Sequence, residues 1–282
     1  RDVDRRLALL RQLAAAGMAE PPKTWNEFFD VARRLTVRDE NGRVTRHGVA
    51  MWGIAWPMIS AIWSEGGELT DREYTNVTLD DPVVARVLGA FQALIHDGAA
   101  IVPDAATGGH RAAFLKGEAA MILDSPAPLR EFLDAASDSF RPLAVLYPAG
   151  AKGRVFAPGG GGLVVRESGD AERTERAIAF IRFMLAPEQL SDYTLRSGYL
   201  AYSGSARESA AQGFATVPGL AAIHDGAQYI RGDFSVNTSV PVRTALDEAF
   251  QRILIRGEDV ATVLREADAK AERELRRERE RR

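Results

Sequence analysis

Amphipathic helices that alternate with short, wholly apolar segments are the feature that most restricts the fold of this chain. Between Val84 and Ile95 the apolar residues recur every three or four positions, which is the period of one helix face. Further along, Ala119–Leu123 is apolar at every position, as is typical of a strand covered on both faces. Because such strands need helices on both sides of their sheet, the alternation predicts an α/β layered fold.

Residues at the ends of these segments predict where helices begin. Thr24 is a helix-capping residue type and precedes a segment that begins at Trp25. Asp80 or Asp81, followed by Pro82, has the same role for the next helix. Further helices are expected at 111–116, at 170–185, from 187 and from 244, and further buried strands at 47–52, 143–146 and 163–165.

The length of the chain allows either one large domain or two ordinary ones. With 282 residues the chain can bury a substantial core. No repeat of fixed period and no low-complexity linker divides it, so two lobes would share a packed boundary. No apolar run approaches the roughly 20 residues that a membrane-spanning helix needs.

Charge and cysteine content exclude several classes of function. The 36 basic and 39 acidic side chains give a net charge of −3, which does not favour a nucleic-acid partner. The absence of cysteine excludes disulfide scaffolds, thiolate nucleophiles and cysteine-ligated metal sites. The four histidines lie in different segments without paired spacing, so we expect no metal ion and no other cofactor.

Two further motifs lack the context that catalysis or nucleotide binding requires. Ser125 follows an expected strand in L-D-S-P-A, without the flanking glycines of a nucleophile elbow. The glycine run at 159–162 leads into an apolar segment, whereas a phosphate-binding loop opens a helix. The run offers backbone N–H groups that a ligand can approach closely, and the alternative is a tight crossing between packed layers.

Aromatic residues gather in M-W-G-I-A-W-P-M-I-S-A-I-W at 51–63. Trp52 and Trp56 fall at the end of an expected strand and in the loop that follows it. Indole faces stack on the C–H surfaces of sugars while the indole N–H donates a hydrogen bond. Both residues are therefore candidates for a sugar pocket, with core packing as the alternative, whereas Trp63 is expected in the core.

Five ordered motifs carry a resemblance to one protein family. They are P-P-K-T-W-N-E-F at 21–28, F-L-K-G-E-A-A-M at 114–121, G-G-L-V-V at 161–165, F-I-R-F-M-L-A-P-E-Q at 180–189 and S-G-Y-L at 197–200. In order and approximate separation they resemble the extracellular solute-binding proteins of sugar-type ABC importers. The resemblance covers nearly the full chain and implies a helix-rich, two-lobed α/β fold of the type II periplasmic-binding-protein kind.

One more segment resembles the branch of this family that binds glycerol-3-phosphate. V-P-V-R-T-A-L-D-E-A-F at 240–250 is similar to the P-Q-I-R-x-x-x-D-E-E motif of that branch. The resemblance implies ligand contacts at Ser125, Gly160, Tyr199 and Arg243, and more loosely at Trp52 or Trp56.

The chemistry of these side chains suits that assignment. Arg243 offers a permanently charged fork that matches the geometry of a phosphate. Ser125 and Tyr199 offer hydroxyl donors, and Gly160 offers a backbone N–H. The alternatives are a surface pair of Arg243 with Asp247 four residues on, and a half-buried loop position for Tyr199.

The resemblance also implies how two lobes divide the chain. Residues 1–159 would form the first part of a C-terminal-type lobe, 160–204 a returning segment of the N-terminal-type lobe, and 205–282 the helical remainder of the C-terminal-type lobe. Family members carry most of the N-terminal lobe before the P-P-K-T-W motif. Few residues precede that motif here, so we expect one lobe to be truncated.

Together these observations lead to a hypothesis about function. We expect a non-enzymatic receptor, at the periplasmic or outer cell surface, that captures a sugar or polyol phosphate for the membrane subunits of an ABC permease. We also expect that this chain carries no signal peptide, because no basic and then apolar segment opens it. One alternative is a glycan-processing enzyme with paired carboxylates among Glu65, Glu118 and Asp124. Another is a truncated receptor without function.

Overall fold

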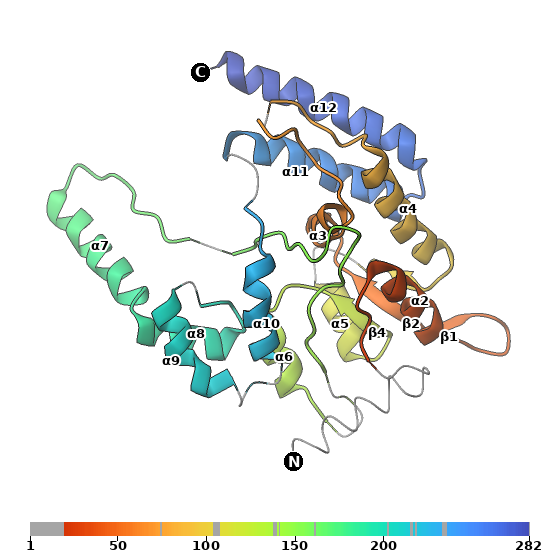
Figure 1. The fold of residues 1–282 in the computed structure, drawn as a ribbon, viewed down its shortest axis with the longest axis horizontal. Helices are drawn as coiled ribbons and strands as arrows, with labels where there is room; N and C mark the ends of the chain where they lie inside the picture. Colours follow the sequence, from red (N-terminus) through yellow and green to blue (C-terminus); the bar gives the residue numbers. More distant parts are fainter. Residues whose placement is uncertain are drawn as a thin grey trace. The chain divides into compact units, whose positions relative to one another are not determined.

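The computed structural model describes residues 20–281, except 74, 104–107, 138–139, 141, 161, 202, 215–216, 218 and 233–235. The sequence also predicts a helical stripe of Leu7, Leu10 and Leu13, and these residues lie outside the described range. The described residues form two compact units (Figure 1). The first unit combines those of Arg1–Asp124, Tyr147–Pro158 and Tyr229–Arg282, and the second combines those of Ser125–Leu146 and Gly159–Gln228.

The first unit contains a four-stranded sheet built around one strand. Its strands are β1 (Val37–Arg38), β2 (Val44–Met51), β3 (Ala100–Ile101) and β4 (Ala119–Leu123). β2 pairs with β3 and β4 in parallel and with β1 in antiparallel orientation. The expected strand at 47–52 is therefore present, but it begins earlier and ends before Trp52.

Helices pack around this sheet, and others form most of the second unit. The first unit has α2 (Trp25–Leu35), α3 (Trp56–Ser64), α4 (Pro82–His96), α5 (Gly109–Leu115), α11 (Val236–Phe250), the π-helix η3 (Gln251–Ile255) and α12 (Val260–Glu280). The second has α6 (Leu129–Asp134), α7 (Ala171–Met184), α8 (Pro187–Ser197), α9 (Gly204–Phe214) and α10 (Leu220–Asp225), and the 3-10 helix η2 (Gly226–Tyr229) leads back to the first. Within the described part of the chain, no helix combines the length and apolar character of a membrane span.

The helix α2 begins as its sequence predicts and packs closely on β2. The Thr24 side chain accepts a hydrogen bond from the N–H of Glu27, whose carboxylate in turn accepts from the N–H of Thr24. These two bonds form a capping box, which satisfies backbone donors that the first helical turn leaves unpaired. At Gly48 of β2 a Cβ atom would lie 1.8 Å from the carbonyl oxygen of Ala32, so only glycine permits this packing.

The main core lies between the sheet and its helices. On α4, the predicted stripe is buried at Val84, Val87, Leu88, Phe91 and Leu94 and partly buried at Ile95. The ring of Phe91 lies 5.9 Å from that of Trp25 and 5.0 Å from that of Phe29, both in edge-to-face geometry, which aromatic rings prefer. The periodicity of this helix is thus a sufficient signal for its buried face.

The chain passes between the two units at four places. Residues of the first unit that lie near these places contact one another. The Tyr147 hydroxyl donates a 2.8 Å hydrogen bond to the carbonyl of Asp124. Edge-to-face contacts link Tyr147 to Phe156 and Phe156 to Tyr229, and the Phe156 N–H donates to the Tyr229 carbonyl at 2.8 Å. Burial, with the nearby charge of Asp124, raises the pKa of the Tyr147 hydroxyl, which therefore stays a donor.

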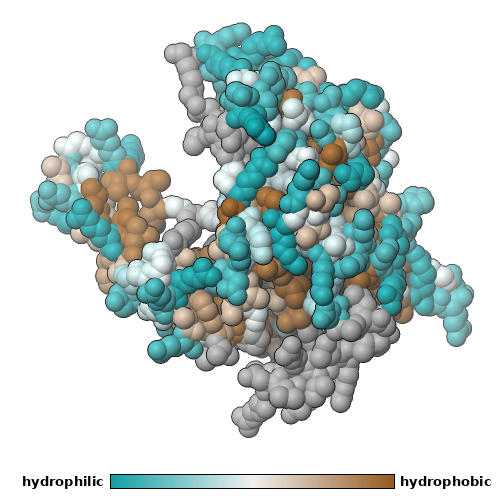
Figure 2. All heavy atoms as spheres, viewed as in Figure 1, coloured by the Kyte–Doolittle hydropathy of each residue, from teal (hydrophilic) through white to brown (hydrophobic). Residues whose placement is uncertain are grey.

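In the second unit two sequence predictions are wrong. Residues 143–146 and 163–165 form no strand, and Val164 is 92% exposed. A strand needs a neighbour for its backbone hydrogen bonds, and no strand is present among the described residues of this unit. The helix α7 buries none of its residues, and Figure 2 shows hydrophobic atoms gathered on its surface.

We expect that Thr24→Ala lowers the free energy of unfolding by about 1 kcal/mol, because the first turn of α2 loses its side-chain acceptor. Urea denaturation followed by circular dichroism measures the change. Thr24→Ser keeps the hydroxyl and serves as the matched control. Equal stability of Thr24→Ala and the wild type would show that the capping box adds nothing.

Candidate ligand-binding site

The parallel pairing of β2 with β4 places two side chains at one edge of the sheet. Met51 and Leu123 are paired residues, so Trp52 and Asp124 follow them directly at the carboxyl ends of neighbouring strands. Trp52 is half-buried, and its ring stacks on that of His110 with centroids 5.6 Å apart and planes 11° apart. His110 comes from α5, the helix that precedes β4.

The loop between Trp52 and Trp56 is held by the C-terminal helices. The N–H of Ala55 donates to Oδ1 of Asp247 at 2.7 Å, and Nε2 of Gln251 donates to the carbonyl of Gly53 at 3.1 Å. The indole Nε1 of Trp56 donates to the carbonyl of Pro158 at 3.0 Å. Both tryptophans therefore sit at the ends of a loop whose backbone is fixed on α11 and η3.

Arg243 lies on α11, one turn before Asp247, and is exposed. Burial raises the pKa of Asp247, while the Ala55 N–H and the charge of Arg243 lower it in part. The two residues, both in the described part of the chain, form no ion pair, and the Asp247 carboxylate binds the Ala55 backbone instead. The surface pair considered from the sequence is thus not formed, and α11 presents the guanidinium at the surface.

In the second unit, the close packing of Gly198 on Pro126 brings the segments of Ser125 and Tyr199 together. Gly198 ends α8 with a φ of 80°, and a Cβ there would lie 2.4 Å from the Pro126 carbonyl oxygen. The residues beside these two are Ser125 and Tyr199. The Tyr199 ring stacks on that of Tyr193, with centroids 5.6 Å apart.

Gly160 also lies in the second unit and is exposed. Its φ of 153° is a conformation that residues with a side chain rarely adopt. The predicted contact residues are thus divided between the units: Trp52, Trp56 and Arg243 belong to the first, and Ser125, Gly160 and Tyr199 to the second.

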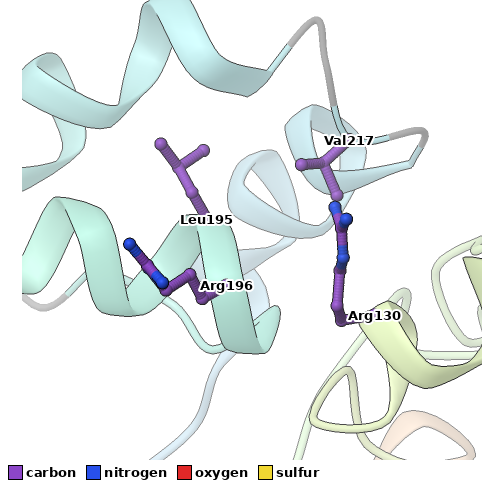
Figure 3. Close-up of a pocket in the computed structure, with 4 residues that line it drawn as sticks. All are labelled: Arg130, Leu195, Arg196 and Val217. Carbon is purple, nitrogen blue, oxygen red and sulfur yellow. The ribbon is translucent and has the colours of Figure 1, made fainter. Parts of the chain in front are cut away.

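A pocket of about 460 Å³ lies within the second unit (Figure 3). It is lined by Arg130, Leu195, Arg196 and Val217. Each arginine is paired along its own helix, Arg130 with Asp134 at 3.0 Å and Arg196 with Asp192 at 2.7 Å. None of the residues predicted from the sequence lines this pocket.

The three carboxylates considered for a glycan-processing enzyme are either bound to basic side chains or exposed to solvent. Glu65 is 3.3 Å from Arg86, and Glu118 is exposed. The Asp124 carboxylate is bound by His110 and by the fork of Arg111. Sequence reasoning did not connect Asp124 with His110 and Trp52, because no local pattern links residues that meet only through strand pairing.

A buried histidine supports the Tyr199 segment. His224 is buried, hydrogen-bonds the backbone of Tyr199 and lies 4.4 Å from the ring of Phe214. Its Nε2 is buried and has no partner among the residues that the structure describes. Burial and the charge of Arg207 lower the pKa of His224, so the neutral ring is favoured.

We expect that Gly198→Ala lowers the free energy of unfolding by about 1–3 kcal/mol, because the new methyl group meets the Pro126 carbonyl and φ is strained. Urea denaturation measures the loss. Gly204→Ala, in α9 where a Cβ meets open space, is the matched control and should be neutral or slightly stabilising. Equal stability of the two variants would contradict this account of the Ser125 and Tyr199 neighbourhood.

We also expect stability to fall as the pH drops below 6.5, the ordinary pKa of histidine. Since folding lowers the pKa of His224, the unfolded chain binds the proton more readily, so this contribution is complete above 6.5 and lost on acidification. Thermal unfolding between pH 7 and pH 5 measures it. His224→Gln should show a weaker pH dependence, whereas the exposed His96→Gln should keep it, and equal slopes would refute the assignment.

The comparisons with known proteins concern both the family and the fold. The profile of the family described as bacterial extracellular solute-binding protein matches residues 8–190. No curated protein matches the chain. Members of this family are the substrate-binding proteins of ABC importers and are not enzymes, so the glycan-processing alternative has no support.

Solved structures match over almost the whole chain. UgpB from Mycobacterium tuberculosis in complex with glycerophosphocholine is 22% identical with a TM-score of 0.80, and the match covers 95% of this chain and 67% of that one. The sugar-binding protein MalE from Xanthomonas citri is 18% identical with a TM-score of 0.78, covering 96% and 68%. The maltose/maltodextrin-binding domain MalE from Bdellovibrio bacteriovorus bound to maltotriose is 18% identical with a TM-score of 0.73, covering 91% and 67%.

These matches confirm the predicted helix-rich α/β fold of the type II periplasmic-binding-protein kind. The chain spans about two-thirds of the length of the proteins it matches. With the family profile matched over more than half of its residues, the chain belongs to the bacterial extracellular solute-binding protein family.

Proposed function

We propose that this protein binds a small sugar or a polyol phosphate for an ABC importer and delivers it to the membrane subunits of the permease. One observation carries the proposal. The loop that bears Trp52 and Trp56 is fixed on α11 through the bond from Ala55 to Asp247, and the same helix presents Arg243. Two indoles and a guanidinium thus belong to one fixed part of the first unit.

The chemistry of this arrangement fits the two ligand classes. Indole faces stack on the C–H surfaces of sugars and polyols. The guanidinium forms paired, charge-assisted hydrogen bonds with phosphate oxygens. Asp247 accepts the Ala55 N–H at Oδ1 and in this way holds the tryptophan loop.

The comparisons support both classes of ligand. UgpB was solved with glycerophosphocholine, and the Bdellovibrio MalE domain was solved with maltotriose. Arg243 favours the phosphate class and the glycerol-3-phosphate-binding branch, because a charged guanidinium fork binds a phosphate anion more strongly than a neutral hydroxyl. In the second unit we propose Ser125 and Tyr199 as hydroxyl donors and Gly160 as a backbone donor to a ligand.

A receptor of this kind works outside the cytoplasmic membrane, at the periplasmic or outer cell surface. Its partner would be the membrane subunits of the permease. Binding selects a closed arrangement only through contacts that differ between the open and closed states. No covalent step is involved, so the ligand leaves unchanged.

Isothermal titration calorimetry with glycerol-3-phosphate, glycerophosphocholine and maltotriose tests this proposal. We expect saturable binding of the phosphate compounds, and Trp52→Ala should weaken it. Arg243→Gln should weaken phosphate binding by about tenfold or more while sparing any maltotriose binding, because a charge-assisted bond is lost.

Arg256→Gln is the matched control, since Arg256 is also an exposed arginine of the C-terminal helices. It should bind like the wild type. Absence of binding for all three compounds would refute the proposed function. Equal weakening by Arg243→Gln and Arg256→Gln would refute the role of Arg243.

A further inference from the structure

We propose that His110 and Asp124 are positioning residues, which fix the plane of the Trp52 indole in the ligand-binding site. The inference deepens the proposed function and rests on it, since it assigns Trp52 as the surface on which the ligand stacks. It concerns a cluster of described residues within the first unit.

Asp124 is the fixed point of the cluster. Its side chain is only 4% exposed, and a carboxylate at that depth needs hydrogen-bond donors to remain charged. Arg111 supplies two, from Nε at 2.7 Å and from Nη2 at 3.2 Å, and His110 Nε2 lies 3.0 Å from the same carboxylate. Asp124 also accepts a bond from Tyr147 at its backbone carbonyl, which anchors the residue from the other side.

His110 links Asp124 to Trp52, because it bonds the carboxylate and stacks on the indole. The His110 side chain is 2% exposed, and its bond to Asp124 sets the rotation of the imidazole ring. The indole of Trp52 lies nearly parallel to that ring, with an angle of 11° between the planes. Because the two rings are stacked, the plane of the imidazole determines the plane of the indole.

Trp52 differs in this respect from other tryptophans of the first unit. Trp25 donates its Nε1 hydrogen to Ser64, and Trp56 donates its Nε1 hydrogen to the Pro158 carbonyl. Within the described ranges, the stack on His110 is the contact that orients Trp52, and its Nε1 has no protein acceptor. The indole is thus oriented through its face, and its N–H remains able to donate to a ligand.

A fixed indole plane strengthens binding, because a side chain that is already ordered loses less rotational freedom when the ligand stacks on it. We expect the loss of this order to weaken binding of glycerophosphocholine by about threefold to tenfold. The ligand itself would touch Trp52, whereas His110 and Asp124 act through it.

Fluorine NMR of protein labelled with 5-fluorotryptophan tests the cluster without any ligand. Trp52→Phe identifies the Trp52 resonance by its disappearance. His110→Gln keeps an amide donor for Asp124 but has no ring to stack, so it should shift and broaden the Trp52 resonance while leaving those of Trp25, Trp56 and Trp63 in place. Asp124→Asn should act on the same resonance, and His96→Gln, at an exposed position, should move none.

The two readouts separate this proposal from the proposed function. An unmoved Trp52 resonance in His110→Gln, or equal shifts of all four resonances, would overturn the positioning role even if ligand binds. If Asp124→Asn fails to fold, His110→Gln alone decides. A moved resonance with unchanged glycerophosphocholine affinity would show that the indole plane does not matter to binding and would also overturn the inference.

Discussion

The parallel pairing of β2 with β4 is the constraint on which the candidate site depends. Because Met51 and Leu123 are partners, the chain leaves both strands at the same edge, with Trp52 and Asp124 as the next residues. The helix α5, which lies between β3 and β4 in the chain, brings His110 against Trp52 at that edge. A shift of one residue in this register would turn the side chains of the strand to the opposite face and separate the three residues.

Local signals in the sequence were sufficient for α2 and α4 of the first unit, whereas the short strands β1 and β3 were not predicted. Thr24 and Asp81 cap α2 and α4, and the apolar period of α4 predicts its buried face. These features depend on residues within one or two turns, which a single sequence displays directly. The same reasoning failed at 143–146 and 163–165, because an apolar run can become a strand only when another strand lies beside it.

The candidate site likewise contains residues that the sequence identifies and contacts that only the folded chain reveals. Residue type pointed to Trp52 and Trp56, and the family resemblance pointed to Arg243. The structure shows how the bond from Ala55 to Asp247 links the tryptophan loop to the helix of the arginine. The stack of His110 on Trp52 was beyond prediction from the sequence. From the sequence, His110 could equally be a buried core histidine and Trp52 an indole packed in the core. Only the register of β2 and β4 shows that the two residues meet.

The hydrogen bonds and ring contacts around Tyr147 connect segments of the first unit that are far apart in the sequence. Asp124, Tyr147, Phe156 and Tyr229 lie at or near the points where the chain leaves or re-enters this unit, and their hydrogen bonds and ring contacts connect them in series. Displacing any one of these residues would therefore disturb its contacts with the next residue in the series. Three separate segments of the chain are thus tied together inside the first unit, although the backbone joins them only by way of the second unit.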